Sequence, residues 1–452
     1  MESINPATEE LLKKFEPFSD EEVSQIIEKS HSAFIEWRRL TLTERKIFNI
    51  KLKEILEKRK EEIAKLITQE MGKPIKQARA EIEKCALALK YYFEKAETFL
   101  APQLVETESK KSYVRFDPLG IVLAVMPWNF PFWQVFRCSA PSVIAGNSLI
   151  LKHASNVSMC SLMIEELYKE AKFPDNIFKS ILYEGDKTSV LMRNPLIKAG
   201  TLTGSEYAGM QIAIEAGSNL KKVVLELGGS DPFIVLDDCE VEKCAYWATR
   251  ARCINNGQSC IAAKRFIVVE SVYEQFKEAF ADEMKKVKVG DPLDEETEVG
   301  PLARKDLLEE VEGQVKKSVD QGAKVILGGE RLKQKGYYFP PTILEDVEKG
   351  MTCCEQEIFA PVAPLIKVKD EKEAISFANS CRYGLGGSIW TRDLMKAEKM
   401  AGKLEVGTVF INGMVKSDPR LPFGGVKFSG FGRELSYFGI REFVNIKSVV
   451  VE

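Results

Sequence analysis

The chain has 452 residues, enough for about two to four domains with sizeable cores. Its 64 lysines and arginines nearly balance 67 aspartates and glutamates, so a nucleic-acid partner is not expected, and the 45% apolar content excludes a disordered acidic chain. The most apolar stretch, residues 120–133, is interrupted by Pro127 and Pro131 and is shorter than the roughly 20 residues of a membrane span. No membrane partner is therefore expected.

Cysteine and histidine usage narrows the chemistry further. The ten cysteines include no pair of CxxC clusters, which predicts reduced thiols and no metal site. The first residues lack the basic and apolar stretches of a secretory signal, so a cytoplasmic location is expected. Because His31 and His153 are the only histidines, carboxylates are expected to carry any acid–base chemistry.

The chain begins with helical periodicity and then changes to alternating strands and helices. Apolar residues spaced by three and four positions predict three helices between residues 19 and 100. Short β-branched runs then alternate with helical segments, which predicts an α/β fold with mostly parallel sheets in two packed layers. These predicted strands cover residues 121–126, 148–151, 222–225, 232–236, 265–269, 323–327, 362–368 and 406–411. The apolar strand at 442–452 needs a partner, such as a neighbouring subunit.

Three short segments carry candidate chemistry. Cys260 ends a loop of small residues and is a candidate nucleophile, or else one more buried cysteine. Glu226 stands among apolar residues at a strand end, where desolvation would raise its pKa toward that of a general base, or where it is merely structural. Asn129 is a candidate oxyanion donor, or else a helix cap. A thiolate, an amide and a carboxylate suffice for covalent catalysis at a carbonyl.

Five motifs, in this order and spacing, resemble the aldehyde dehydrogenase superfamily over nearly the whole chain: PWNFP (127–131), ELGG (226–229), GQSC (257–260), EIFAPV (357–362) and LPFGG (421–425). The resemblance implies that the Cys260 thiolate attacks an aldehyde and that Asn129 and the Cys260 N–H hold the oxyanion. It also implies that hydride passes to a nicotinamide and that Glu226 activates the water that hydrolyses the thioester.

The same resemblance implies a dinucleotide bound on a Rossmann-like sheet without a GxGxxG motif, which this chain also lacks. Gly204 and Ser205 stand where a predicted strand passes into a helix, whose N–H groups can face the pyrophosphate. By resemblance, the remaining cofactor residues are Trp128 beside the cofactor, Lys152 on the adenosine ribose, Glu357 on the nicotinamide ribose, and Phe359.

Ser155 bears on the choice between NADP and NAD. Many NAD-using relatives carry an acidic residue there, which would repel a 2′-phosphate. A neutral hydroxyl beside the Lys152 cation favours NADP, with NAD possible at lower preference. The alternative is that Ser155 only caps the next helix.

Within the superfamily, GQSCIAAKRF (257–266) and KSDPRLP (416–422) are similar to NADP-preferring succinate-semialdehyde dehydrogenases. Such enzymes need a cation and hydroxyl donors for the far carboxylate, and Arg137 and Ser417 are the expected anchors, with Trp133 and Phe423 as an apolar wall. Arg420 either helps to bind the substrate carboxylate or stabilises its own loop through Asp418. Glutaric semialdehyde fits the same anchors. Three alternatives stay open. The protein could oxidise a broader range of aldehydes, or it could be a binding or structural relative without catalytic activity. It could also release the thioester to CoA, but the presence of Glu226 as a water activator argues against this.

The expected domains are a dinucleotide-binding domain (1–102 and 118–229) and a catalytic domain (230–435). The family resemblance also implies a small oligomerisation element (103–117 and 436–452) that supports a homodimer or homotetramer. The active site is expected between the two larger domains, with aldehyde and nicotinamide entering from opposite sides.

Overall fold

The computed structural model describes all 452 residues. A short hairpin, β1 (Glu2–Ile4) and β2 (Leu11–Lys14), precedes four helices rather than the predicted three: α1 (Asp20–Trp37), α2 (Leu42–Lys58), α3 (Lys60–Met71) and α4 (Ile75–Leu100). Capping boxes at Ser19 and Thr41 start α1 and α2. The additional break falls at Arg59, which is neither glycine nor proline, so it left no signal in the sequence.

A six-stranded sheet in the order β19-β9-β8-β5-β6-β7 forms the first α/β body. All neighbours are parallel except the short edge strand β19. Its elements are β5 (Ile121–Met126), α5 (Trp133–Ile144), β6 (Ser148–His153), α6 (Ser158–Glu170), β7 (Phe178–Ile181), β8 (Ile197–Thr203), α7 (Glu206–Ser218), β9 (Lys222–Glu226) and β19 (Gly430–Phe431). Chain order reverses at β5, which lies between β6 and β8, and the carboxyl ends of parallel strands at such a switch point form a ligand crevice.

A seven-stranded sheet in the order β12-β13-β14-β11-β10-β16-β17 forms the second body, in which only β12 is antiparallel. Its strands are β10 (Asp231–Val235), β11 (Ala263–Val269), β12 (Lys324–Leu327), β13 (Thr342–Glu345), β14 (Val362–Val368), β16 (Gly386–Trp390) and β17 (Thr408–Ile411). Its helices are α8 (Val241–Cys253), α9 (Tyr273–Lys285), α10 (Lys305–Asp320), α11 (Thr352–Glu355), α12 (Glu371–Asn379) and α13 (Leu394–Ala401). The predicted α/β fold is confirmed, although β7 and β19 of the first sheet and β13 and β16 of the second lie outside the predicted strands.

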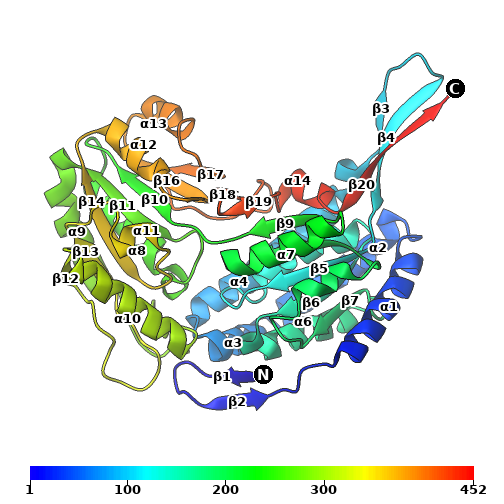
Figure 1. Cartoon of the computed structure of the whole chain (residues 1–452), viewed down its shortest axis with the longest axis horizontal. Helices are drawn as coiled ribbons and strands as arrows, with labels where there is room; N and C mark the ends of the chain where they lie inside the picture. Colours follow the sequence, from blue (N-terminus) through cyan, green and yellow to red (C-terminus); the bar gives the residue numbers. More distant parts are fainter.

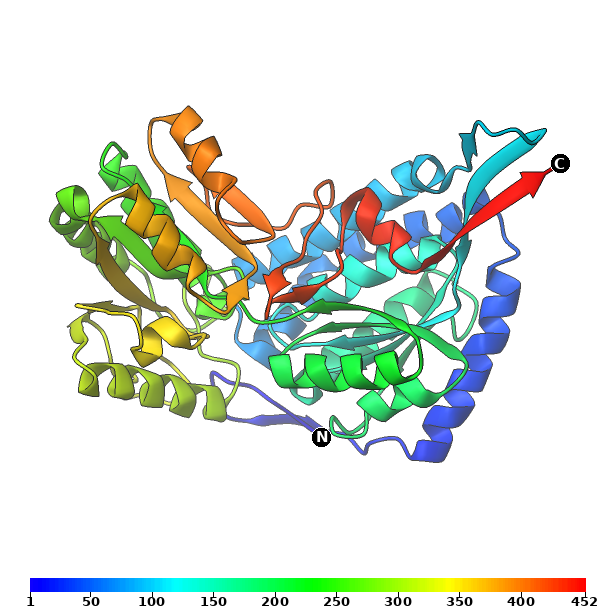
Figure 2. The same ribbon diagram turned by 45° about the horizontal axis from the view of Figure 1, so that its top comes forward.

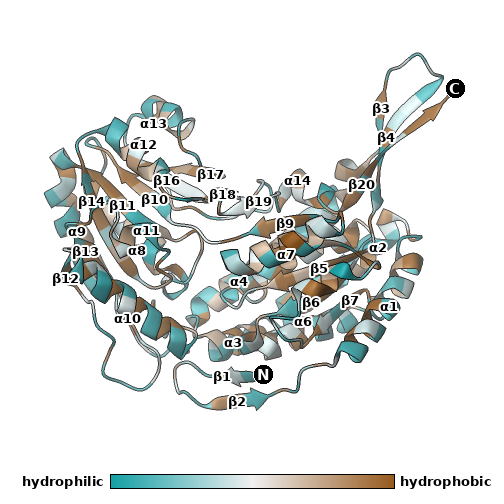
Figure 3. Ribbon diagram, viewed as in Figure 1, coloured by the Kyte–Doolittle hydropathy of each residue, from teal (hydrophilic) through white to brown (hydrophobic).

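The chain passes from one body to the other between β9 and β10, and the two bodies form the arms of an open V (Figure 1). Each has its own apolar core: Phe233, Phe266 and Phe280 are buried in the second, and Trp37 and Phe136 in the first. The hydropathy colouring shows apolar segments in the strands between more polar helices (Figure 3). Before residue 435 the chain crosses back, because β19 pairs with β9 of the first sheet.

A ribbon of three strands projects from the first body (Figures 1 and 2). It consists of β3 (Gln103–Val105), β4 (Lys111–Pro118) and β20 (Val444–Val451), in the order β20-β4-β3. The predicted terminal strand thus pairs along its whole length with β4 of its own chain. The remaining elements are β15 (Tyr383–Gly384), β18 (Val426–Lys427) and α14 (Ser436–Arg441). None of the helices is both long enough and apolar enough to cross a bilayer.

Candidate active site

The loop before Cys260 turns sharply because three consecutive residues have left-handed backbone angles. Asn255, Asn256 and Gly257 have φ values of 54°, 59° and 76°. Asparagine tolerates this region better than most residues, and a Cβ at position 257 would lie 2.3 Å from the carbonyl carbon of Ala360, so only glycine fits there. Cys260 follows this turn and is half-buried, whereas the other nine cysteines are buried.

Hydrogen bonds join the Asn129 loop, between β5 and α5, to the Cys260 loop. The Asn129 Nδ2 donates to the Gln258 carbonyl at 3.1 Å. The Asn255 Nδ2 donates to the carbonyls of Asn129 and Gln258, both at 2.8 Å. Asn129 does not cap α5, because the N–H groups of Phe132 and Trp133 donate instead to the carboxylate of Glu81 on α4. The structure therefore brings Asn129 beside the loop of the candidate nucleophile Cys260.

Glu226 ends β9 with a buried carboxyl group, and neither oxygen has a hydrogen-bond partner. Burial raises its pKa well above the ordinary value, while the Arg137 cation opposes this shift and Glu434 adds to it. The direction agrees with that expected of a general base. Two glycines allow the motif segments to approach one another closely. A Cβ at Gly424 would lie 2.7 Å from the Glu226 Oε1, and a Cβ at Gly229 would lie 2.7 Å from the Cys260 carbonyl oxygen.

Arg137 on α5 is buried close to several ionisable groups, and its guanidinium already has partners within the protein. It forms a buried ion pair with Glu434 and donates to the Thr203 Oγ1 at 3.1 Å. Its guanidinium carbon lies 4.6 Å from the centre of the Phe423 ring. Its charge lowers the pKa of both the Cys260 thiol and the Glu226 carboxyl. Arg137, the expected anchor for the substrate carboxylate, thus already uses part of its hydrogen-bonding capacity on Glu434 and Thr203.

Ser417 is joined to a lysine that the sequence did not single out. Lys84 on α4 donates to the Ser417 Oγ at 2.7 Å, and the Trp133 Nε1 donates to the same oxygen at 3.2 Å. The Lys84 Nζ also lies 4.4 Å from the Trp133 ring centre. Burial, followed by the nearby Arg137 cation, lowers the Lys84 pKa to about 8. In sequence, Lys84 is one of several lysines on an amphipathic helix, so only the tertiary contact distinguishes it.

Arg420, by contrast, is exposed and donates to Asp418 through both Nε and Nη2, at 2.8 and 2.6 Å. This geometry agrees with the loop-bracing alternative.

Two cavities lie on either side of the joined loops. The larger, about 650 Å³, is lined by Asn129 and Cys260 and by the cofactor candidates Trp128, Gly204, Ser205, Glu357 and Phe359. The other, about 430 Å³, is lined by Lys84, Phe130, Trp133, Cys253 and Ile254. Five of the predicted cofactor residues thus line the larger cavity, whereas Trp133 is the one predicted substrate residue that lines the other. Lys152, Ser155, Glu226, Arg137, Ser417 and Phe423 line neither cavity.

The larger cavity ends on the first turn of α7, where Ser205 is the N-cap and its Oγ accepts from the Ala208 N–H at 3.3 Å. Glu206 would repel a phosphate here, but it accepts hydrogen bonds from Arg382 and Tyr383 of the second body. Across the cavity, the rings of Trp128 and Phe359 meet edge to face at 5.7 Å.

Lys152 and Ser155 lie beyond this turn, at the end of β6. A Cβ at Gly185 would lie 3.8 Å from the Lys152 Nζ. Ser155 is exposed, and α6 has no side-chain cap at its first turn, which argues against the capping alternative. His153 is buried, and its ring nitrogens face the carbonyls of Met126 and Pro131, so it packs rather than binds a ligand.

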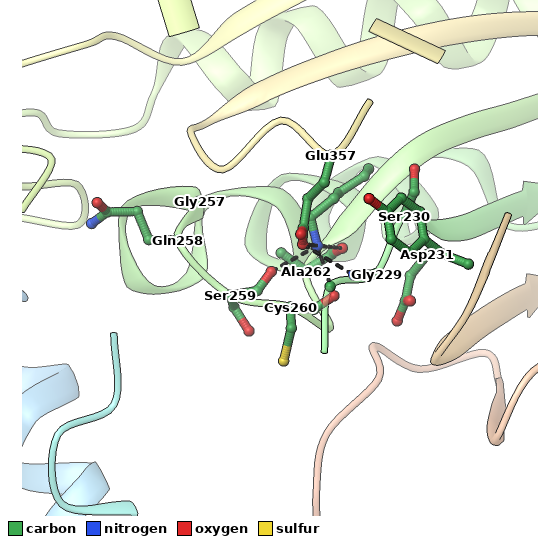
Figure 4. A network of polar contacts seen from close by, with 12 residues as sticks. Gly229, Ser230, Asp231, Gly257, Gln258, Ser259, Cys260, Ala262 and Glu357 are labelled. Atoms are coloured by element: carbon green, nitrogen blue, oxygen red, sulfur yellow. Dashed lines mark hydrogen bonds and ion pairs between the residues drawn. The ribbon is translucent and has the colours of Figure 1, made fainter. Parts of the chain in front are cut away.

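Glu357 and the nucleophile loop are joined by Lys264, a second residue to which the sequence gave no role. The Lys264 Nζ donates to the carbonyls of Ser259 and Cys260 at 2.8 and 2.7 Å, and lies 3.1 Å from the Glu357 Oε1 (Figure 4). Glu357 also accepts from the Gly229 N–H at 3.2 Å. Burial raises the pKa of Cys260 to about 12, and the Lys264 cation is the strongest opposing influence.

Comparison with known proteins agrees with this geometry. Residues 1–449 match the model of the aldehyde dehydrogenase family. A probable NADP(+) succinate-semialdehyde dehydrogenase from Synechocystis is 48% identical over 447 residues, 99% of this chain and 98% of the relative. A succinate-semialdehyde dehydrogenase [NADP(+)] 1 from Mycobacterium tuberculosis H37Rv is 43% identical over 450 residues, with the same coverage.

The crystal structure of a succinic semialdehyde dehydrogenase from Streptococcus pyogenes with NADP+ superposes with a TM-score of 0.97. It is 39% identical, and the match covers 100% of this chain and 99% of that one. The resemblance read from the five motifs is confirmed. The chain belongs to the aldehyde dehydrogenase family.

Proposed function

We propose that this protein oxidises succinic semialdehyde, or a similarly short aldehyde with a far carboxylate, to the carboxylic acid with NADP+. The observation that carries the proposal is the position of the half-buried Cys260 beside Asn129, on a cavity also lined by the cofactor candidates. The names of the relatives from Synechocystis and Mycobacterium tuberculosis support both substrate and cofactor.

The residues around the larger cavity fit a dinucleotide. The first turn of α7 suits a pyrophosphate, Glu357 suits ribose hydroxyls, and Trp128 and Phe359 offer apolar contact. The Lys152 cation and neutral Ser155 favour a 2′-phosphate, so NADP is preferred and NAD is used less well. When bound, the nicotinamide accepts the hydride.

In this mechanism the Cys260 thiolate forms a C–S bond to the aldehyde carbon, and the carbonyl electron pair moves onto oxygen. The second N–H of the Asn129 amide and the Cys260 N–H stabilise this oxyanion. Loss of hydride leaves a thioester. Glu226, whose oxygens have no partner in the protein, then takes a proton from the attacking water, and the C–S bond breaks to release the acid and the thiol.

The far carboxylate is held from the side of the second cavity. Ser417 and Arg137 stay candidate anchors, and Lys84 joins them because its ammonium contacts the Ser417 hydroxyl and the Trp133 ring. Trp133 and Phe423 supply apolar surface. Glutaric semialdehyde would use the same groups.

The proposed domains follow the predicted boundaries except at the end of the catalytic domain, because β19 (Gly430–Phe431) already pairs with the sheet of the first body. The protein is proposed to be a homo-oligomer. The supporting observation is the apolar surface of the projecting ribbon, where Leu104, Ile446 and Val450 are 77%, 62% and 54% exposed. Ten cysteines without a disulfide suit the reducing cytoplasm.

The test is a set of initial rates with succinic semialdehyde, glutaric semialdehyde and neutral pentanal, each with NADP+ and with NAD+. The expected result is the highest kcat/KM for a semialdehyde with NADP+, with no turnover by Cys260→Ala. Mass spectrometry of quenched reactions should find the acyl group on Cys260. A preference for pentanal would overturn the substrate, and full activity of Cys260→Ala would overturn the mechanism.

A further inference from the structure

Lys264 is a buried cation directly behind the nucleophile. It stands near the start of β11, with only 2% of its side chain exposed. An ammonium group has three N–H donors, and here three acceptors receive them: the carbonyls of Ser259 and Cys260 and the carboxylate of Glu357. The carbonyl of Ala262 is more distant, at 3.4 Å.

A buried charge is costly unless it is fully partnered, so a lysine at this position requires all three contacts. The two carbonyls belong to the nucleophile loop, whereas Glu357 comes from the segment before β14, nearly a hundred residues later. The ammonium thus fixes the nucleophile main chain relative to the carboxylate proposed to hold the nicotinamide ribose. Figure 4 shows Ser259 and Cys260 on one side of these contacts and Glu357 on the other.

Position and charge act together on the thiol. Four charged groups influence Cys260 besides its burial: Lys264 and Arg137 lower its pKa, with Lys264 first, whereas Glu357 and Asp231 raise it. Arg137 is paired with Glu434 and Lys264 with Glu357, but of these two cations only Lys264 is also hydrogen-bonded to the Cys260 backbone.

We propose that Lys264 is a positioning residue, whose ammonium sets the Cys260 loop against Glu357 and favours the thiolate form of the nucleophile. This rests on the proposed function only in taking Cys260 as the nucleophile. The test uses no aldehyde and no cofactor, so its failure is distinct from failure of the proposed substrate.

The experiment measures the rate at which iodoacetamide labels Cys260 in the full chain across a pH series. Tandem mass spectrometry locates the label, which separates Cys260 from Cys253 nearby. Lys264→Gln should shift the labelling profile to higher pH and slow labelling at about pH 8 roughly tenfold per unit of pKa. Lys264→Arg, which keeps the charge, should recover part of the rate.

Glu357→Gln removes an opposing charge and should change labelling in the other direction, toward faster reaction at the same pH. This variant leaves Lys264 in place, so it tests the proposal even if Lys264→Gln does not fold. If Lys264 only stabilised the fold, the labelling rates of Lys264→Gln and Glu357→Gln would not change in opposite directions. Unchanged profiles in both variants, or slower labelling in Glu357→Gln, would overturn the proposal.

Discussion

The side-chain amide of Asn255 donates a hydrogen bond to the main-chain carbonyl of Asn129 at 2.8 Å, across 126 residues of sequence. The same nitrogen donates to Gln258 at 2.8 Å, and the Asn255 N–H donates to the Gln77 Oε1 at 2.7 Å. One asparagine therefore joins the proposed oxyanion donor, the nucleophile loop and α4.

Asn255→Ala should reduce both stability and turnover. It leaves the Asn129 carbonyl without this donor, removes one of the two donors to the Gln258 carbonyl, and places alanine at a φ of 54°, together about 3 kcal/mol of unfolding free energy. Urea unfolding and kcat measure the two effects. Asn219→Ala is the control: it loses one hydrogen bond, to the Glu215 carbonyl at 2.8 Å, and should lower stability by about 1 kcal/mol with kcat unchanged. Equal kcat in both variants would contradict the prediction.

Glu226→Gln should stabilise the protein at neutral pH while blocking thioester hydrolysis. Because the folded-state pKa of Glu226 is raised, folding disfavours its ionisation, and this cost appears as pH rises above the unfolded value of about 4.5. Glutamine removes the cost, so the melting temperature should exceed that of the wild type near pH 7, with the difference vanishing below about pH 4.5.

Turnover of Glu226→Gln should stop after a burst of about one NADPH per active site, because no base remains to activate water. The stability effect has a control of opposite sign. The pKa of Glu22 is lowered by hydrogen bonds from the Ser19 backbone and hydroxyl, so Glu22→Gln should lower stability at neutral pH. Linear turnover by Glu226→Gln would exclude its role as the base.

Gly424→Ala should impair activity through Glu226. The new methyl group would lie 2.7 Å from the Glu226 Oε1, at a φ of 151° that alanine rarely adopts. The carboxyl group must move, so we expect a drop in kcat of about tenfold or more. Gly217→Ala on α7 is the matched control, because no atom lies within 4 Å and alanine favours helix. A Gly424→Ala enzyme with normal kcat would show that the carboxyl position is not critical.

Ser155→Glu should reduce use of NADP more than use of NAD. A carboxylate near Lys152 would repel a 2′-phosphate but could accept hydrogen bonds from ribose hydroxyls. The kcat/KM for NADP+ should fall by at least about tenfold relative to that for NAD+. Ser155→Gln, of similar size and uncharged, should change the ratio much less. Equal losses for the two cofactors in Ser155→Glu would count against this site.

Lys84→Met should remove much of the preference for charged aldehydes. The kcat/KM for succinic semialdehyde should fall about tenfold or more, with little change for pentanal. In the wild type, the KM for the semialdehyde should rise above about pH 8, where Lys84 loses its proton. Lys90→Met on the exposed side of α4 is the control and should behave as the wild type. An unchanged ratio of the two aldehydes in Lys84→Met would exclude Lys84 as an anchor.

Sequence periodicity predicted the α/β class and most strands of the two main sheets, since alternating β-branched runs and helices are local patterns. It missed the break at Arg59 and the strands β7, β13, β16 and β19, and it implied β8 only by the strand end before Gly204. Arg59 carries no glycine or proline signal, and the missed strands are short: β7 and β13 have four residues, β19 has two, and β16 opens with two glycines. The motifs also singled out Cys260, Asn129 and Glu226 as candidates, because each stands where a strand or helix passes into a loop.

By itself, the sequence determined the residue types available for chemistry and the family, because motif order and spacing are linear properties. Only the tertiary structure decided which charged side chains form ion pairs and hydrogen bonds with which partners. Arg137 is paired with Glu434, Lys84 with Ser417, and Lys264 with the Cys260 carbonyl and Glu357. Partners in each of these contacts, except the Lys264–Cys260 pair, are separated by tens to hundreds of residues. A lysine or arginine looks the same on a solvated helix face as at a buried contact until packing removes water from it.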